Sequence, residues 1–256
     1  MRVILSLVAL LSLVVSSAAC DGNDEPDRDT IEADTLDDTQ DTVEPDTTSD
    51  TEVTPLDTAL PDFEVIQTNT ELRNGVTAWV GHVTDGDTLG VWVGTQSNRK
   101  LHVVRMLGLA APECNKTSRQ APDGARYSCS ADDEYYGLAS YNELKAMVED
   151  KTVTITCDVA ANTPCDSDAF DRRLAYVIID GKDAAVEMAR RGAAFAYTSF
   201  SASKRGQICA AEYEARAAKR GMWALGSVSQ VLARMSADTR SWYNNHHDRR
   251  CDEAMR

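Results

Sequence analysis

The chain has no surplus of basic residues, although such a surplus is the usual sign of a nucleic-acid-binding protein. Its 256 residues include 26 Lys or Arg and 41 Asp or Glu, and the formal net charge is −15. The excess acid is concentrated in residues 21–62, which hold 16 acidic residues and one basic residue, Arg28. Residues 63–256 hold 25 acids and 24 bases, a net charge of −1. Anion binding is therefore not excluded, but it would have to come from a local cluster of cations.

The chain also lacks an apolar run long enough to cross a membrane. Its N-terminal run, 3–15, follows Met1-Arg2 and precedes small residues at 17–19. This pattern is typical of a secretory signal peptide, which we place at residues 1–19. Cys20, directly after the small residues, also resembles the cysteine that receives the lipid in bacterial lipoproteins. We therefore expect an exported protein, either a cell-envelope lipoprotein or freely secreted, that touches a membrane only through a lipid anchor at Cys20.

No Cys-x-x-Cys pair is present, so the cysteines do not indicate a zinc site. Of the seven cysteines, six remain if Cys20 carries a lipid. An even set in an exported protein indicates disulfides. Six cysteines allow 15 connectivities. Closure between neighbours in the sequence favours three pairs: Cys114–Cys129, Cys157–Cys165 and Cys209–Cys251.

Aromatic residues are absent from residues 21–62, and apolar ones are few. Such a segment cannot bury enough surface to offset the entropy lost on ordering. We predict a disordered acidic linker over 20–66, a folded domain over 67–226, and a helical extension with a polar tail over 227–256. A calcium-binding acidic repeat is the alternative for the linker, but no fixed ligand spacing supports it.

Hydrophobic periodicity in the folded part predicts five short strands with a helix between the third and the fourth. The strands are expected at 76–83, 88–94, 100–108, 152–157 and 173–179. The intervening helix carries Leu138, Tyr141, Leu144 and Val148 on one face. Further helices are expected after Asp183, at 207–220 and at 227–236, whereas 114–129 is expected to be a polar loop. This order favours an α+β fold, a five-stranded Greek-key barrel with three or four helices.

One stretch, 85–113, places charged side chains at the ends of two neighbouring strands. Asp85 and Asp87 precede one strand, Arg105 lies in the next, and Glu113 follows it. Carboxylate oxygens suit a hard cation and a guanidinium suits a phosphate. The alternative interpretation is a Gly-Asp turn with surface charges. A second basic group, Arg172, begins the last strand and could reach the same end of the barrel.

Four segments of the chain resemble the staphylococcal nuclease (thermonuclease) family. They are DGDT at 85–88, RMLGLAAPE at 105–113, DAFDRRLAY at 168–176 and EARAAKRGMW at 214–223. Each is a weak match alone, but the four occur in the family's order over roughly residues 76–226. The resemblance implies an OB-fold-like barrel and hydrolysis of the phosphodiester bonds of DNA or RNA with Ca²⁺.

By position, the resemblance implies that Arg105 and Arg172 stabilise the phosphate charge and that Glu113 orients or activates water. Arginine and glutamate suit phosphodiester hydrolysis, because two guanidiniums can hold the charge that builds on phosphate oxygens. A carboxylate can take a proton from water. The expected metal ligands are Asp87 and the backbone carbonyl of Ala111. We expect a monomer, and no protein partner is inferred.

The sequence departs from the family's pattern at three positions. Ala110 stands where the family has a metal-binding Asp, so the Ca²⁺ site is expected to be weakened. Phe170 stands where Tyr is common, and Asp171 replaces a Gly and puts an anion beside Arg172. A catalytically impaired nucleic-acid-binding barrel is therefore the alternative function, and a purely structural envelope domain is a third.

Several other polar residues receive a structural interpretation. Asp85 is expected to be a turn residue, with indirect help to the metal as the alternative. His82 and His102 are expected to pack or to face solvent. His246 and His247 lie in the polar tail, and their adjacency is attributed to chance.

Overall fold

The computed structural model describes residues 68–95, 97–121 and 124–256. The predictions of a signal peptide, a lipidated Cys20 and an acidic linker fall on residues 1–67 and lie outside the described residues. Within the described part of the chain, none of the helices is both long and apolar enough to cross a bilayer.

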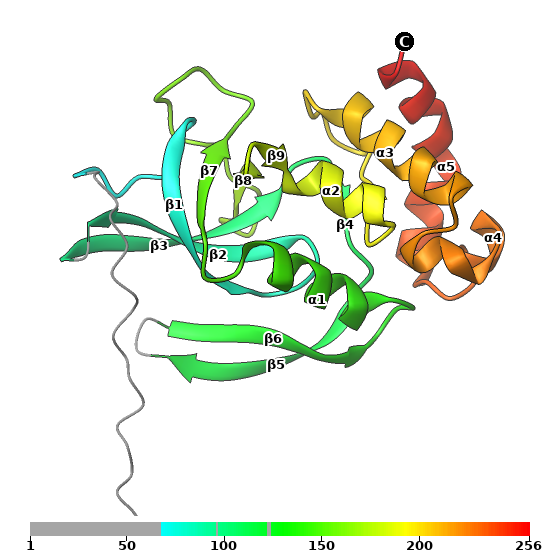
Figure 1. Ribbon diagram of the computed structural model, residues 1–256, viewed down its shortest axis with the longest axis horizontal. Coiled ribbons are helices and arrows are strands. Elements are labelled where there is room, and N and C mark those ends of the chain that lie inside the picture. The colour runs from blue at the N-terminus through cyan, green and yellow to red at the C-terminus, as the bar shows by residue number, and fades with distance from the viewer. Residues whose placement is uncertain (1–67, 96, 122–123) are drawn as a thin grey trace, which may run out of the picture. The chain divides into compact units, whose positions relative to one another are not determined.

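Five strands form a closed barrel, and this confirms the predicted fold (Figure 1). The barrel consists of β1 (Val76–Val83), β2 (Thr88–Thr95), β3 (Asn98–Met106), β7 (Thr152–Thr156) and β8 (Arg173–Ile179). Neighbouring strands are antiparallel except where β3 meets β8 in parallel, and this pairing closes the barrel. Closure leaves these strands without a free edge, which is how small barrels avoid edge-to-edge association.

The barrel core includes Leu89, Val91 and Val93 of β2, as their alternation predicted, whereas in β3 the alternation of Leu101, Val103 and Leu107 indicated the wrong face. Val104 and Met106 of β3 are buried, whereas Val103 before them is exposed. Helix α1 (Gly137–Val148) covers one side of the barrel with its buried Tyr141, Leu144 and Val148. The predicted apolar face of this helix is therefore correct. The helix begins at Gly137, and Tyr136 is its N-cap residue.

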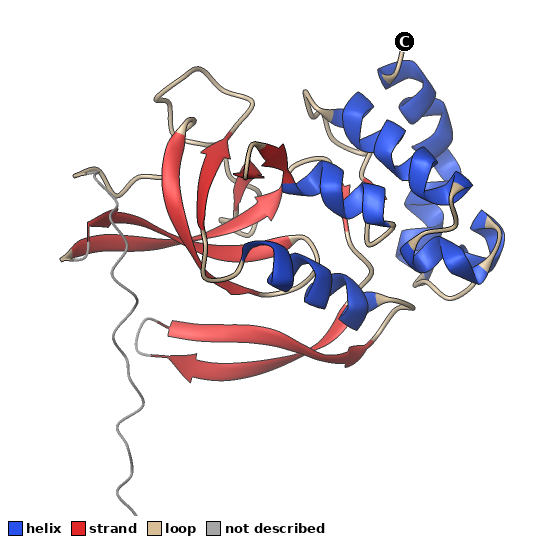
Figure 2. Cartoon of the chain, viewed as in Figure 1, coloured by secondary structure: helices blue, strands red, loops and turns tan. Residues whose placement is uncertain are grey.

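Residues 114–129 are not a loop, as the sequence had suggested, but most of a β-hairpin. Strand β5 (Cys114–Ala121) pairs with β6 (Gly124–Asp132) in a separate two-stranded sheet that lies along α1 (Figure 2). The hairpin has few apolar residues to bury. A disulfide between Cys114 and Cys129 ties its two strands together near the barrel.

Short elements follow the barrel strands and position the remaining helices. Strand β9 (Lys182–Asp183) leads into α2 (Ala184–Arg191), and the Asp183 carboxylate accepts the N-cap hydrogen bond from Ala185 at 2.9 Å, as predicted. Strand β10 (Phe195–Ala196) pairs with β4 (Leu109–Ala110). Then come α3 (Arg205–Ala217), a 3-10 turn η1 (Gly221–Leu225) and α4 (Val228–Leu232).

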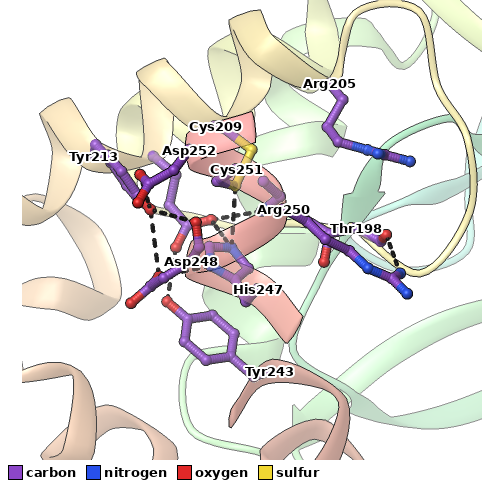
Figure 3. Close-up of a disulfide and its surroundings, with 12 residues drawn as sticks. Thr198, Arg205, Cys209, Tyr213, Tyr243, His247, Asp248, Arg250, Cys251 and Asp252 are labelled. Carbon is purple, nitrogen blue, oxygen red and sulfur yellow. Dashed lines mark hydrogen bonds and ion pairs between the residues drawn. A yellow bond between two sulfur atoms is a disulfide. The ribbon is translucent and has the colours of Figure 1, made fainter. Parts of the chain in front are cut away.

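The C-terminal tail was predicted to be polar and held by Cys251, and the structure shows that most of it forms helix α5 (Ala237–Ala254). The helix buries Tyr243, His247 and Cys251 at four-residue spacing against α3. Cys251 forms a disulfide with Cys209 of α3 (Figure 3). Together with Cys157–Cys165, the structure therefore contains all three disulfides in the expected pairs.

His247 is part of a buried polar network, so its position is not a matter of chance. Its Nε2 atom lies 2.9 Å from Oε2 of Glu212, a fully buried residue of α3. The other carboxylate oxygen of Glu212 accepts hydrogen bonds from Arg216 Nε at 2.8 Å and from Tyr243 at 3.0 Å. The His247 ring stacks on Tyr243 with a centroid distance of 4.1 Å. This network compensates the cost of burying the Glu212 charge.

Candidate active site

Asp85, Gly86 and Asp87 form a tight turn between β1 and β2. The N–H groups of Thr84 and Asp85 both donate to the Thr88 carbonyl, at 2.8 and 3.3 Å. A Cβ atom on Gly86 would lie 2.0 Å from Oγ of Ser140 and 2.6 Å from the methyl group of Ala111. Only glycine allows the turn to approach α1 and the end of β4 this closely. The turn holds both aspartates in buried positions.

Asp87 holds Arg105 and has both carboxylate oxygens engaged. Oδ1 accepts from the Thr88 hydroxyl at 2.9 Å, and Oδ2 accepts from the Ala111 N–H at 2.8 Å. Oδ2 also forms an ion pair with the Arg105 guanidinium. Burial raises the pKa of Asp87 to about 6, although Arg105 acts in the opposite direction.

Arg105 and Arg172 line one cavity of about 600 Å³. Arg105 lies opposite Leu174 in the parallel pairing of β3 with β8, so Arg172 comes just before the paired residues. The apolar part of the lining includes Leu107, Phe170 and Phe200. The barrel thus brings together two arginines that are far apart in the sequence.

Asp168, rather than Asp171, orients Arg172. The Asp168 Oδ2 atom accepts from Arg172 Nε at 2.8 Å and lies 2.7 Å from its Nη2. Oδ1 accepts from the N–H groups of Phe170 and Arg172 at 2.9 and 3.0 Å. Asp171 is exposed with φ of 59°, a left-handed conformation that Asp tolerates and Gly adopts freely. The replacement of Gly at this position therefore keeps the turn.

Glu113 lies outside the residues that line this cavity, just beyond β4. Its side chain is 57% exposed, and Oε2 lies 3.3 Å from Nζ of Lys116 in the hairpin. Lys116 Nζ also lies 2.8 Å from Oδ2 of Asp85. Burial alone would lower the pKa of Lys116, but the Asp85 and Glu113 carboxylates outweigh it and raise that pKa above its usual value.

The backbone of Glu113 is held on both sides by the segment that leads into α1. Its N–H donates to Oε2 of Glu134 at 2.9 Å, and its carbonyl accepts from the Glu134 N–H at 2.9 Å. A Cβ atom on Gly137 would lie 2.0 Å from the Glu113 carbonyl oxygen. Glu134 and Gly137 therefore set the position from which the Glu113 side chain extends.

A comparison with known protein families identifies the family of this domain. Residues 103–225 match the family model of staphylococcal nuclease homologues. The domain belongs to the staphylococcal nuclease family. No curated protein matched the chain. The match spans Arg105, Glu113 and Arg172, so the family assignment and the geometry concern the same residues.

The Ca²⁺ site common in this family does not fit the donors of this staphylococcal nuclease domain. Ala110 offers no side-chain oxygen, and Asp87 already accepts three donors. One oxygen of Asp85 accepts from the Asp87 N–H at 3.1 Å and the other faces Lys116. Among the described residues, no three His, Cys, Asp or Glu side chains cluster as metal ligands would. Ca²⁺ needs six to eight oxygens, and these two carboxylates are occupied by hydroxyl, N–H and ammonium groups.

In this staphylococcal nuclease domain, the roles of Lys116, Asp168 and Glu134 were not predicted from the sequence. Lys116 was overlooked because the hairpin was interpreted as a loop. The segment Pro122-Asp123-Gly124 is a turn signal between two stretches of similar length, and it could have revealed the hairpin. Asp168 lies four residues before Arg172. This spacing suggests an ion pair only once it is known that residues 168–172 form a turn. Nothing local indicates that Glu134 contacts Glu113.

Proposed function

We propose that this staphylococcal nuclease domain hydrolyses phosphodiester bonds of DNA or RNA, with the phosphate held between Arg105 and Arg172. The observation that carries the proposal is the shared cavity of the two guanidiniums, each oriented by its own aspartate. Guanidiniums held in this way need no reorganisation when charge builds on the phosphate oxygens. They also match a phosphate through paired hydrogen bonds.

In the proposed reaction, water attacks phosphorus while the bond from phosphorus to the leaving oxygen breaks. The proton lost by water passes to the Glu113 carboxylate, and the leaving oxygen takes a proton from solvent. Glu113 suits this role because its side chain is 57% exposed and its backbone is fixed by Glu134. A general base acts best when its position is fixed and its carboxylate is accessible to water.

Exposed aromatic rings beside the arginines favour a nucleotide over a small phosphate ester. Phe170 and Phe200 are 79% and 70% exposed, and both line the cavity. The Phe200 ring contacts that of Tyr197 at a centroid distance of 5.7 Å. Bases stack on such rings without regard to sequence, and each stacked base contributes about 1–3 kcal/mol. We infer that an unpaired base occupies this apolar side of the cavity.

Calcium dependence, which the resemblance implied, is not proposed, because the donors of Asp85 and Asp87 do not fit the ion. Binding without cleavage is the second candidate function, and the lost carboxylate at Ala110 is the observation that favours it. A cleavage assay combined with a binding measurement distinguishes the two functions.

Export and anchoring through Cys20 are also proposed. The three disulfides support export, because such bonds persist in oxidising compartments, and Cys20 directly after the small residues supports the anchor. We expect Cys20→Ser to release the protein from membranes. If the unaltered protein is already found in the soluble fraction, the anchor is refuted while export stands.

A plasmid-nicking assay tests the proposed function. Glu113→Gln and Arg172→Lys should each lower the rate by about 10²–10³-fold, while both variants still bind single strands. Arg249→Gln on α5, whose side chain is 64% exposed, serves as the control and should cleave at the normal rate. Binding of single strands without cleavage by the unaltered protein would favour the second candidate.

A further inference from the structure

Lys116 joins two acidic groups beside the expected metal ligand Asp87, because one of them, Asp85, belongs to the same turn and the other is the proposed base, Glu113. Its Nζ atom lies 2.8 Å from Oδ2 of the buried Asp85 and 3.3 Å from Oε2 of the exposed Glu113. The Asp85 side chain is 9% exposed and the Lys116 side chain 34%. The ammonium therefore neutralises a buried carboxylate and still reaches solvent beside the proposed base.

The hairpin fixes Lys116 in this place. Cys114, two residues before it, is buried and bonded to Cys129, and Lys116 pairs with Cys129 across the hairpin. A change of register between Asn115 and Lys116 marks a bulge. Bulges redirect side chains and often lie next to active sites. Cys129 also lies near the Asp85 turn, since its Sγ atom is 3.6 Å from the Thr84 carbonyl oxygen.

Charge and space at the site agree with an ammonium in place of a metal ion. Ala110, where a carboxylate is missing, is buried at 8% exposure and offers no side-chain oxygen. The remaining Asp87 is neutralised by Arg105. One singly charged cation, Lys116, balances Asp85, whereas a doubly charged ion would need more oxygen donors than this site provides.

We propose that the Lys116 ammonium takes the place of the catalytic metal ion in this domain and binds the substrate phosphate directly. The inference rests on the proposed function for its substrate and goes beyond it in naming the cation. An ammonium has three N–H donors. Two face Asp85 and Glu113, and the third is available to a phosphate oxygen on the exposed side. Lys116 keeps its proton throughout, so the reaction described above is unchanged in its atom balance.

Calorimetric titration with Ca²⁺ tests the first half of the proposal without any need for activity. Even weak extracellular calcium sites bind at about 10⁻⁴–10⁻³ M. The unaltered protein should show no saturable binding in that range. The double variant Lys116→Ala, Ala110→Asp should bind, because it removes the ammonium and restores a carboxylate. Binding by the unaltered protein, or none by the double variant, would overturn the proposal.

Cleavage in the presence of a chelator tests the second half. The unaltered protein should cut DNA with EDTA present, and Lys116→Met should lose about 10²–10³-fold in rate. Lys116→Arg keeps the charge and should recover part of this loss. Lys182→Ala, an exposed lysine of β9, is the matched control for a lost positive charge. Thermal melting of each variant separates loss of function from loss of folding.

The outcomes separate this inference from the proposed function. Activity that disappears with EDTA and returns with Ca²⁺ overturns the role of Lys116 but leaves the nuclease assignment intact. A protein that cuts under no condition refutes the nuclease assignment, and the calorimetric titration still decides whether an ammonium or a metal occupies the site.

Discussion

Oε2 of Glu134 accepts a hydrogen bond of 2.9 Å from the backbone N–H of Glu113. Its other oxygen accepts from the N–H of Ser236 at 2.7 Å and from the Thr239 hydroxyl at 2.8 Å. One buried carboxylate thus links the proposed base to the first turn of α5. The C-terminal helix therefore supports the candidate active site, although it contributes no residue to the lining of the cavity.

Glu134→Gln should destabilise the fold and disturb Glu113. An amide can accept at one oxygen only, so one N–H of Glu113 or Ser236 loses its partner. An unsatisfied buried donor costs about 1–3 kcal/mol. We expect the free energy of unfolding to fall by this amount in urea titrations, together with a lower cleavage rate. If stability fell by this amount while the cleavage rate stayed the same, the position of Glu113 would not depend on Glu134.

Low pH should remove the contribution of Glu134 to folding stability. Burial favours the neutral form, but hydrogen bonds from Ser236, Glu113 and Thr239 outweigh it and lower the pKa of Glu134 below its usual 4.5. A depressed folded-state pKa gives stability that is present above the unfolded-state value and is lost as the pH falls through the folded-state value. The stability difference between the unaltered protein and Glu134→Gln should therefore shrink below about pH 4.5.

The contribution of Asp87 to folding stability should change with pH in the opposite direction. Burial raises its pKa from 3.8 to about 6, so the folded protein holds a proton that the unfolded chain has released between these values. The contribution of Asp87 to stability should therefore fall as the pH rises from 3.8 to about 6, with a limiting slope of about 1.4 kcal/mol per pH unit. Urea titrations of the unaltered protein and Asp87→Asn across this range measure it. A difference that grows with pH would mean that Arg105 outweighs burial.

Gly137→Ala should lower the cleavage rate by more than its loss of folding stability would explain. The new Cβ would lie 2.0 Å from the Glu113 carbonyl oxygen, so the Glu113 backbone must shift. Asn142 in the same helix is exposed, and Asn142→Ala serves as the control. We expect a reduced cleavage rate in Gly137→Ala and a normal one in Asn142→Ala. Equal rates in the two variants would contradict the proposed position of Glu113.

Glu212→Gln should destabilise the contact between α3 and α5. Burial by itself raises the pKa of Glu212, but the His247 hydrogen bond and Arg216 outweigh it and keep the pKa low. Removing one member of a buried charged pair costs about 3–5 kcal/mol. Glu253→Gln on α5 is the matched control, because the Glu253 side chain is 56% exposed and should matter little. Thermal melting of both variants measures the difference, and equal melting temperatures would contradict the role given to Glu212.

The barrel could be predicted from the sequence because strands such as β1 and β7 bury alternate side chains. The hairpin and α5 could not, for a common physical reason. Residues 114–132 contain few apolar residues, and a disulfide joins the two strands that they form. Helix α5 buries only a narrow stripe, Tyr243, His247 and Cys251, whose four-residue spacing is easily missed among polar neighbours.

The proposed catalytic residues were found because they lie in recognisable segments, whereas the groups that position them were not. Arg105 and Arg172 carry their own sequence signal. Lys116 acquires its role only through the fold, since it meets Asp85 across a long stretch of chain and a bulge. Glu134 depends in the same way on partners from a distant helix.

A second apolar core, separate from that of the barrel, bears on where the domain can be cut. Phe195, Met222 and Trp223 are buried together with Val231 and Tyr243 of the C-terminal extension. A recombinant fragment that stopped at residue 226 would match the family region and yet expose this core and leave Cys209 unpaired. Any fragment intended for assay or crystallisation should therefore extend past Cys251.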